Sequence, residues 1–324
     1  MRKLTLNLSS SRFIRWMLGL IIVLFLSVQV YVFLPVLNSP ADGYLVRKGN
    51  IQSVDITRQW QEADSHFQEL DLLSSSGLKV KATIRTPIQF KGPLPVALLL
   101  GGIGTGRDAC RVIPRIQHVI CVSISYPYYG GKVIGGLGFF YNLRHIQQGV
   151  KDTPPALMLV LDYVLSQTYS DRRQVELLGV SLGSYFISIP AVIDQRVSRV
   201  WITHGAAQPV NAMIHYSERQ SGKNYFKRMF AYYIGYAIGS QHVDPEKWVG
   251  RIAPRPVVFI NAENDMTFPA ASVAALHNAA AQPKEIVWTK GAHVTPGRRE
   301  VVDQISNIIL NRIEGEFLKR RSNE

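Results

Sequence analysis

Two glycines, Gly179 and Gly183, flank a serine at the point where a predicted strand runs into a predicted helix. The strand is expected from the strand-forming residues at 175–178, and the helix from the residues at 184–189. A serine on so sharp a turn needs small neighbours, because a Cβ at either glycine would collide with the adjacent strand or helix. The pattern therefore places Ser181 at the end of a strand, with its hydroxyl exposed above a sheet.

Strand and helix patterns alternate along most of the chain. Two runs that alternate apolar and polar residues, at 66–72 and 78–84, predict an antiparallel hairpin. Apolar runs predict buried strands at 96–100, 119–124, 175–178, 197–203, 256–260 and 285–288. Helices are expected to open at 152–155 and to cover 270–281 and about 300–317. This order predicts an α/β fold with a mostly parallel central sheet, flanking helices and an N-terminal hairpin.

Two segments interrupt the alternation. A Gly-rich loop is expected at 130–138, either as a rim of a site or as a plain surface loop. A longer, aromatic-rich insertion covers 208–249, between two predicted strands. We interpret this insertion as a small helical cap, with ordinary packing of its aromatic residues as the alternative.

The amino-terminal segment is apolar enough to cross a bilayer. Residues 16–37 carry no charge, and they would form about 33 Å of helix. A cleaved signal peptide would have a shorter apolar core of about 7–15 residues and then a small-x-small site. The best cleavage candidate here, Ser39–Ala41, is poor. We therefore predict a transmembrane signal anchor and linker at 1–41 and a globular domain at 42–324, with secretion after cleavage as the alternative.

Charge predicts the orientation of this anchor. Four basic residues precede the apolar segment without an acidic residue among them, whereas Arg47 and Lys48 follow it. This excess predicts a cytoplasmic amino end and a globular domain on the far side, periplasmic or extracytoplasmic. The chain as a whole has a formal net charge of +13. A basic surface of this kind can contact anionic lipid headgroups or simply be soluble, and without a recognisable nucleic-acid-binding module we expect no nucleic acid as partner.

The chain has two cysteines, Cys110 and Cys121. Their spacing does not fit a metal site, and two thiols are too few for a disulfide framework. One falls in a helix-compatible stretch and the other on the next predicted strand. We therefore expect buried free thiols, although pairing in an oxidising compartment is open.

Serine chemistry needs two partners, because a hydroxyl is a weak nucleophile that requires a base, and the base requires an orienting carboxylate. Among eight histidines, His293 is the best candidate base, since it follows the last predicted strand in a Gly–Ala–His loop. Asp265 is the best candidate acid, since it follows the preceding strand. Glu263 is its first substitute and Asp244 a weaker one.

Residues from about 66 to 315 resemble the α/β-hydrolase superfamily. The Gly–x–Ser–x–Gly, Asn–Asp and Gly–Ala–His elements follow that superfamily's order of nucleophile, acid and base, here Ser181, Asp265 and His293. The resemblance implies the α/β-hydrolase fold and hydrolysis of an ester, thioester or amide through an acyl-enzyme. We therefore expect a serine hydrolase of the esterase or thioesterase type, acting on a small-molecule acyl substrate, with no metal or cofactor implied.

The superfamily often carries a His–Gly–x–Gly oxyanion loop after its third strand, and this chain has Gly101–Gly104 there without the histidine. The glycines still allow backbone N–H groups to point inward. Ile103 and Leu182 are the predicted oxyanion donors. Gly102 is a candidate pocket residue, and His204, at the end of another strand, is either a pocket residue or a structural histidine.

Two other classes of protein compete with a hydrolase. The stretch Gly104–Ala109 fits the dinucleotide pattern G-x-G-x-x-A, but that pattern needs an acidic residue about 20 positions later, and none occurs between Asp108 and Asp152. A nucleotide-binding Rossmann domain is therefore excluded. An acyltransferase that uses the same acyl-enzyme, and a catalytically silent binding protein with the same fold, remain as alternatives.

Overall fold

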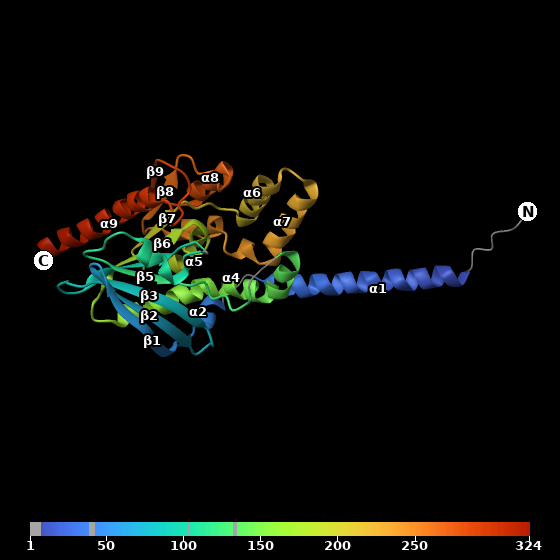
Figure 1. The fold of residues 1–324 in the computed structure, drawn as a ribbon, viewed down its shortest axis with the longest axis horizontal. Helices are drawn as coiled ribbons and strands as arrows, with labels where there is room; N and C mark the ends of the chain where they lie inside the picture. Colours follow the sequence, from blue (N-terminus) through green and yellow to red (C-terminus); the bar gives the residue numbers. More distant parts are fainter. Residues whose placement is uncertain (1–7, 39–42, 103, 132–134) are drawn as a thin grey trace, which may run out of the picture. The chain divides into compact units, whose positions relative to one another are not determined.

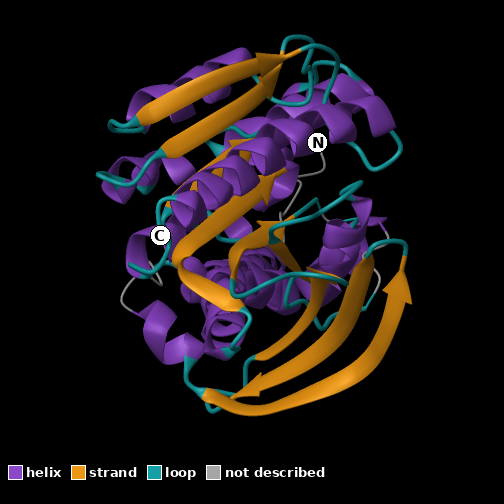
Figure 2. Cartoon of the chain, turned by 90° about the vertical axis from the view of Figure 1, so that its left-hand side faces the viewer, coloured by secondary structure: helices purple, strands orange, loops and turns teal. Residues whose placement is uncertain are grey.

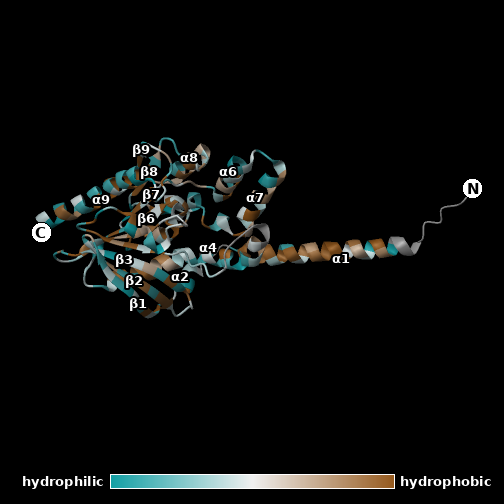
Figure 3. Cartoon of the chain, in the orientation of Figure 1, coloured by the Kyte–Doolittle hydropathy of each residue, from teal (hydrophilic) through white to brown (hydrophobic). Residues whose placement is uncertain are grey.

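The computed structural model describes residues 8–38, 43–102, 104–131 and 135–324. The chain divides into two compact units, Met1–Ser39 and Pro40–Glu324. The first contains α1 (Leu8–Phe33) and a short turn of 3-10 helix, η1 (Leu34–Val36). By length and apolar composition the segment Arg12–Val36 is able to span a membrane (Figure 3). A signal sequence near the amino terminus has the same length and composition.

The second unit is built on one sheet, which has nine strands in the described part of the chain (Figure 1). The strands are β1 (Ile51–Glu62), β2 (Ser65–Ser74), β3 (Lys79–Pro87), β4 (Leu94–Leu100), β5 (Ile120–Ile124), β6 (Ser170–Val180), β7 (Arg199–Thr203), β8 (Val257–Ala262) and β9 (Lys284–Thr289). Their order across the sheet is β1-β2-β3-β5-β4-β6-β7-β8-β9. The first three strands and the β3–β5 pair are antiparallel, and all other neighbours are parallel. The predicted hairpin and mostly parallel sheet are confirmed.

Helices cover both faces of the sheet (Figure 2). The helices of this unit are α2 (Tyr44–Lys48), α3 (Ala109–Val112), α4 (Gly135–Ser166), α5 (Ser188–Ile193), α6 (Pro209–Ser221), α7 (Tyr225–Ala237), α8 (Ala270–Ala279) and α9 (Arg299–Ser322). Single 3-10 turns are η3 (Gly106–Asp108), η4 (Ser181–Tyr185), η5 (Ser240–His242), η6 (Pro245–Lys247) and η7 (Val249–Ile252). Successive side chains of a strand point to opposite faces of the sheet, so the core has two parts. One part packs against α4, α5 and α8, and the other packs against α3 and α9.

Strands β4, β5 and β8 are buried along their whole length, as their largely apolar sequences predict. Strand β1 is different: most of its residues are exposed, and its polar sequence gave no strand prediction. It forms the edge of the sheet, and its hydrogen bonds to β2 compensate for a sequence without an apolar face.

The helix expected to open at Asp152 begins much earlier, at Gly135, and this prediction was wrong. Pro154 and Pro155 lie inside α4, although proline usually ends a helix because it lacks an N–H donor. Buried residues on both sides of the prolines, such as Leu143 and Leu157, hold the two halves in one continuous element. Part of the predicted 130–138 loop is therefore helical, and residues 132–134 lie outside the described part of the chain.

The segment 208–249 is helical, as predicted: it contains α6, α7 and the 3-10 turns η5 and η6, and it ends where η7 begins. The two helices pack through Val210, Ile214 and Ala231, which form a small apolar cluster of their own. Gly235 allows this packing, because a Cβ there would lie 3.1 Å from the Val210 side chain.

Both cysteines are buried free thiols: Cys110 lies on α3, in the connection between β4 and β5, and Cys121 lies on β5. Burial raises the pKa of Cys110 to about 11 and that of Cys121 to about 12.

Candidate active site

The turn between β6 and η4 holds Ser181 in a left-handed backbone conformation, with φ of +54°. A non-glycine residue rarely adopts this conformation, so the surrounding contacts must impose it. A Cβ on Gly183 would lie 1.9 Å from the carbonyl oxygen of Leu100, and one on Gly179 would lie 2.9 Å from the Cα of Ser184. Both glycines are therefore required by close backbone packing, which is the reason the sequence analysis assigned to them.

Ser181, His293 and Asp265 are joined by two short hydrogen bonds. The Oγ atom of Ser181 lies 2.7 Å from Nε2 of His293, and Nδ1 of His293 lies 2.6 Å from Oδ2 of Asp265. An ionised carboxylate only accepts hydrogen bonds, so Nδ1 donates to Asp265 and Nε2 accepts from the serine hydroxyl. The structure thus brings together three residues that lie far apart in the sequence.

The carboxylate of Asp265 is kept ionised by its hydrogen bonds. Burial alone would raise its pKa, but the donors from His293 and Thr267 outweigh burial and hold the pKa below its usual value. The backbone N–H of Thr267 donates to Oδ1 of Asp265 at 2.8 Å. Both oxygens of the carboxylate are therefore engaged, and the side chain is fixed in one orientation.

The two substitute carboxylates of the sequence analysis lie elsewhere. Asp244 accepts hydrogen bonds from the backbone N–H groups of Gln208 and Glu246 and caps η6. Glu263 is exposed at the end of β8. Of the three candidates, Asp265 is the one whose carboxylate contacts His293.

Of the two predicted oxyanion donors, Ile103 lies outside the described residues. Leu182 follows Ser181 in the first turn of η4, where backbone N–H groups have no partner within the helix. The glycine loop that follows β4 turns back at Gly102, whose carbonyl accepts hydrogen bonds from the N–H and the hydroxyl of Thr105. The start of this loop lies next to the serine turn, because a Cβ on Gly183 would be 3.2 Å from the carbonyl oxygen of Gly101.

Several contacts that hold His293 had no signal in the sequence. The N–H of Val294 donates to Nδ1 of His204 at 2.8 Å, and the guanidinium of Arg298 donates to the carbonyl of His293 at 2.5 Å. The ring of Phe268 stands edge-on to the His293 ring, 5.5 Å between centroids. His204 is buried, and it contacts the loop that carries His293.

The side chains of His204, Asp265 and His293 also come within 4.8 Å of one another, a donor set that a metal ion can use. However, Nδ1 of His204 accepts from Val294, and Nδ1 of His293 donates to Asp265. A metal bound to either nitrogen of His293 would have to break its hydrogen bond to Ser181 or to Asp265. The arrangement is therefore better suited to proton transfer than to metal binding.

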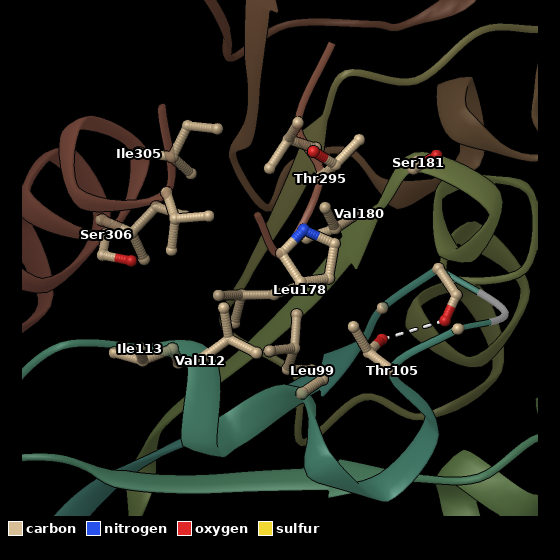
Figure 4. Close-up of a pocket in the computed structure, with 18 of the residues that line it drawn as sticks. Leu99, Thr105, Val112, Ile113, Leu178, Val180, Ser181, Thr295, Ile305 and Ser306 are labelled. Carbon is tan, nitrogen blue, oxygen red and sulfur yellow. Dashed lines mark hydrogen bonds between the residues drawn. The ribbon is translucent and has the colours of Figure 1, made fainter. Parts of the chain in front are cut away.

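A cavity of about 380 Å³ opens beside Ser181 and His293 (Figure 4). Gly102 lies in its wall, whereas His204 is not among the described residues that line it. Most of the side chains labelled in Figure 4 come from β4, β6, α9 and the end of α3 with the residue after it: Leu99, Leu178, Val180, Ile305, Ser306, Val112 and Ile113. Thr105 and Thr295 line the cavity from loops and turns. The predicted nucleophile thus stands at the edge of a largely apolar chamber.

No protein-family model matches the sequence, and no curated protein sequence matches it. Solved structures do resemble it. An acetyl xylan esterase from Paenibacillus sp. R4 gives a TM-score of 0.61 at 15% identity, over 83% of this chain and 92% of that one. The α/β-hydrolase GrgF from Penicillium sp. sh18 gives 0.51 at 15%, over 76% and 98%. The chain has the α/β-hydrolase fold.

A third similar structure is a cold-adapted esterase from an Arctic intertidal metagenomic library, with a TM-score of 0.52 at 13% identity, over 79% of this chain and 99% of that one. At such identities the similarity shows the fold alone. Within the α/β-hydrolase fold of this chain, the ends of β6, β8 and β9 bring Ser181, Asp265 and His293 to one edge of the sheet.

Proposed function

We propose that this protein is a serine hydrolase that cleaves an ester or thioester through an acyl-enzyme. The observation that carries the proposal is the unbroken hydrogen-bond chain from Ser181 Oγ through His293 to Asp265, with lengths of 2.7 and 2.6 Å. The strained backbone of Ser181 and the cavity beside it give further support. The similar solved structures are named as esterases or hydrolases, which agrees with this reaction class.

In the proposed reaction, the Ser181 hydroxyl attacks the carbonyl carbon of the substrate while Nε2 of His293 takes its proton. Asp265 holds His293 in the tautomer that leaves Nε2 free to accept, and its charge stabilises the imidazolium that forms. The N–H groups of Leu182 and Ile103 stabilise the oxyanion. His293 then protonates the leaving alcohol or thiol, and a water activated by the same histidine releases the acyl group.

A fluorophosphonate probe tests for an activated serine. The full chain is expected to be labelled in detergent, and Ser181→Ala and His293→Ala are expected to abolish labelling. Ser166→Ala, an exposed serine on the end of α4, is the control and should leave labelling unchanged. A folded wild-type chain that stays unlabelled would contradict the proposal. Product analysis with an added alcohol or amine acceptor separates hydrolysis from acyl transfer.

We also propose that 1–41 anchors the protein in a membrane through residues 16–37, with the amino end in the cytoplasm and the domain at 42–324 on the far side. The apolar segment Arg12–Val36 supports this proposal. An anchored chain should stay with the membrane after alkaline carbonate extraction and should keep its amino terminus. A soluble chain that begins near residue 42 would instead show cleavage of a signal peptide.

The segment 208–249 is proposed to act as a cap over the site. His215 and Arg219, on α6, both contact the carbonyl of Met266, next to Asp265. Movement of α6 would therefore displace the loop that carries Asp265. Arg219→Ala should change KM for bulky esters more than kcat. An unchanged KM would argue for a packing role only.

A further inference from the structure

The cavity beside Ser181 continues into the layer between the sheet and α9. Its wall includes Ala97 on β4 and Leu178 on β6, which lie on the face of the sheet that packs against α9. On the opposite side it is lined by Ile305, Ser306 and other residues of α9 (Figure 4). The space therefore extends below the sheet edge that holds the catalytic residues.

Strand register gives the depth of this space. Ala97 pairs with Glu176, four residues before Val180 at the end of β6. At about 3.3 Å per residue, the wall runs about 13 Å along the strands. That length corresponds to roughly eight to ten carbon atoms of an extended chain, whose C–C bonds are about 1.5 Å long.

The connection from β4 to β5 explains why the layer is not filled. It crosses this face of the sheet with only one turn of 3-10 helix and the four-residue α3. Small side chains, Ala97 and Ala109, line the space that a longer helix would occupy. An empty apolar cavity destabilises a protein, because its lining atoms lose their contacts.

The cavity is suited to apolar groups. None of the described residues that line it is aspartate, glutamate, lysine or arginine. Ala97 and Cys121, which pair with each other at the end far from the serine, are at most 2% exposed, so that end is closed. Dry cavities with apolar walls bind apolar ligands.

We propose that this cavity binds the unbranched apolar acyl chain of the substrate, of medium length, while its carbonyl lies at Ser181. The inference rests on the proposed ester hydrolysis and names its substrate class. The closed end favours the acyl group over the leaving group. The acyl group stays attached to Ser181 in the intermediate, whereas the leaving group must depart before water enters.

Two series of esters test the assignment on the full chain in a single detergent. In the first, the acyl chain grows from two to fourteen carbons on one phenolic leaving group. Each added methylene should raise kcat/KM about fourfold, until the cavity is full near eight to ten carbons. In the second, acetate esters carry alcohols of increasing length, and kcat/KM should stay nearly flat.

A substitution in the wall links the profile to this cavity. Ser306→Phe should lower kcat/KM for the ten-carbon ester at least about 30-fold and change that for the acetate less than about threefold. Asn307, the next residue of α9, is exposed, so Asn307→Phe is the matched control. It should leave the dependence of kcat/KM on acyl-chain length unchanged. Circular dichroism checks folding. If Ser306→Phe unfolds, Ala97→Leu at the closed end should shorten the preferred chain.

The outcomes separate this inference from the proposed function. Hydrolysis of short esters with a flat acyl profile would overturn the acyl site and leave the hydrolase in place. If kcat/KM rises with chain length only in the alcohol series, the assignment of the cavity to the acyl chain is also overturned. If Ser306→Phe and Ala97→Leu leave the dependence of kcat/KM on acyl-chain length unchanged, the acyl chain binds outside this cavity and the assignment is overturned. No turnover of any ester, together with no fluorophosphonate labelling, would remove both proposals.

Discussion

Nδ1 of His204 accepts a hydrogen bond from the backbone N–H of Val294, the residue that follows the proposed catalytic base. His204 is 1% exposed and has a left-handed backbone, with φ of +46°. Burial, and then the nearby His293, lower the pKa of His204 to about 4. A neutral His204 therefore carries its proton on Nε2 and keeps Nδ1 free to hold the His293 loop.

This arrangement predicts a pH dependence of stability. Unfolded histidine titrates near pH 6.5, so between pH 6.5 and 4 the unfolded chain binds a proton that folded His204 does not. The contribution of neutral His204 is complete above pH 6.5 and is lost as the pH falls toward 4. This loss amounts to about 3 kcal/mol of the free energy of unfolding.

The variant His204→Asn isolates this effect, because asparagine tolerates a left-handed backbone and retains an acceptor but does not titrate. Urea titrations at pH 7 and pH 4.5 should show a smaller pH-dependent loss in the variant than in the wild type. Asp265, whose pKa is lowered, titrates below this window and does not interfere. Equal losses in both proteins would exclude His204 as the source.

Asp265→Asn should lower kcat by about 10⁴-fold, because an amide can donate to Nδ1 and so stabilise the wrong tautomer of His293. The position of the ring should be preserved, so KM is expected to change little. Steady-state kinetics with one chromogenic ester measures both. Glu263→Gln is the matched control at an exposed carboxylate nearby, and it should retain nearly full activity. Equal losses in the two variants would contradict the role of Asp265.

Gly183→Ala should destabilise the fold by at least about 3 kcal/mol, since the added Cβ would meet the Leu100 carbonyl oxygen at 1.9 Å. Backbone atoms of a central strand cannot move away cheaply. Gly315→Ala on α9 is the opposite case, because nothing lies within 4 Å of its Cβ. It should stabilise the protein by about 0.5–1 kcal/mol. Thermal melting compares the two, and a tolerated Gly183→Ala would disprove the packing argument.

Arg85 attaches α3 to the sheet. Its guanidinium donates to the carbonyls of Ile113 and Cys110 at 2.6 and 3.1 Å, and the side chain is buried. Arg85→Met would leave these buried acceptors without a donor, at a cost of about 3 kcal/mol in the free energy of unfolding. Arg115→Met, at a mostly exposed position, should cost less than about 0.5 kcal/mol. Similar urea midpoints for the two variants would refute this role.

The parts of the fold that follow from local patterns were predictable. A strand buried on both faces has a continuous apolar sequence, and Val257–Ala262 lies within two residues of the predicted 256–260. The exposed edge strand Ile51–Glu62 was not predicted from the sequence, because hydrogen bonds to its neighbour β2, and not an apolar face, determine its conformation. Helix α4 was predicted too short, because its packing overrides Pro154 and Pro155.

The candidate site was predictable only as a set of residue types in chain order. The sequence alone leaves Asp265, Glu263 and Asp244 as possible acids, because the path of the loop after a strand decides which carboxylate reaches the histidine. Arg298 and the cavity had no signal at all. The cavity depends on how far α9 stands from the sheet, and this distance is a property of the whole layer.

The two buried thiols make the protein a convenient subject for cysteine mapping. Cys110 and Cys121 are the two cysteines in the chain, both at most 1% exposed, with pKa values raised by burial. A maleimide needs an accessible thiolate, so the native protein should not be labelled. A single cysteine introduced at an exposed position will then be the reactive group, and an impermeant reagent applied to intact cells will report on which side of the membrane it lies.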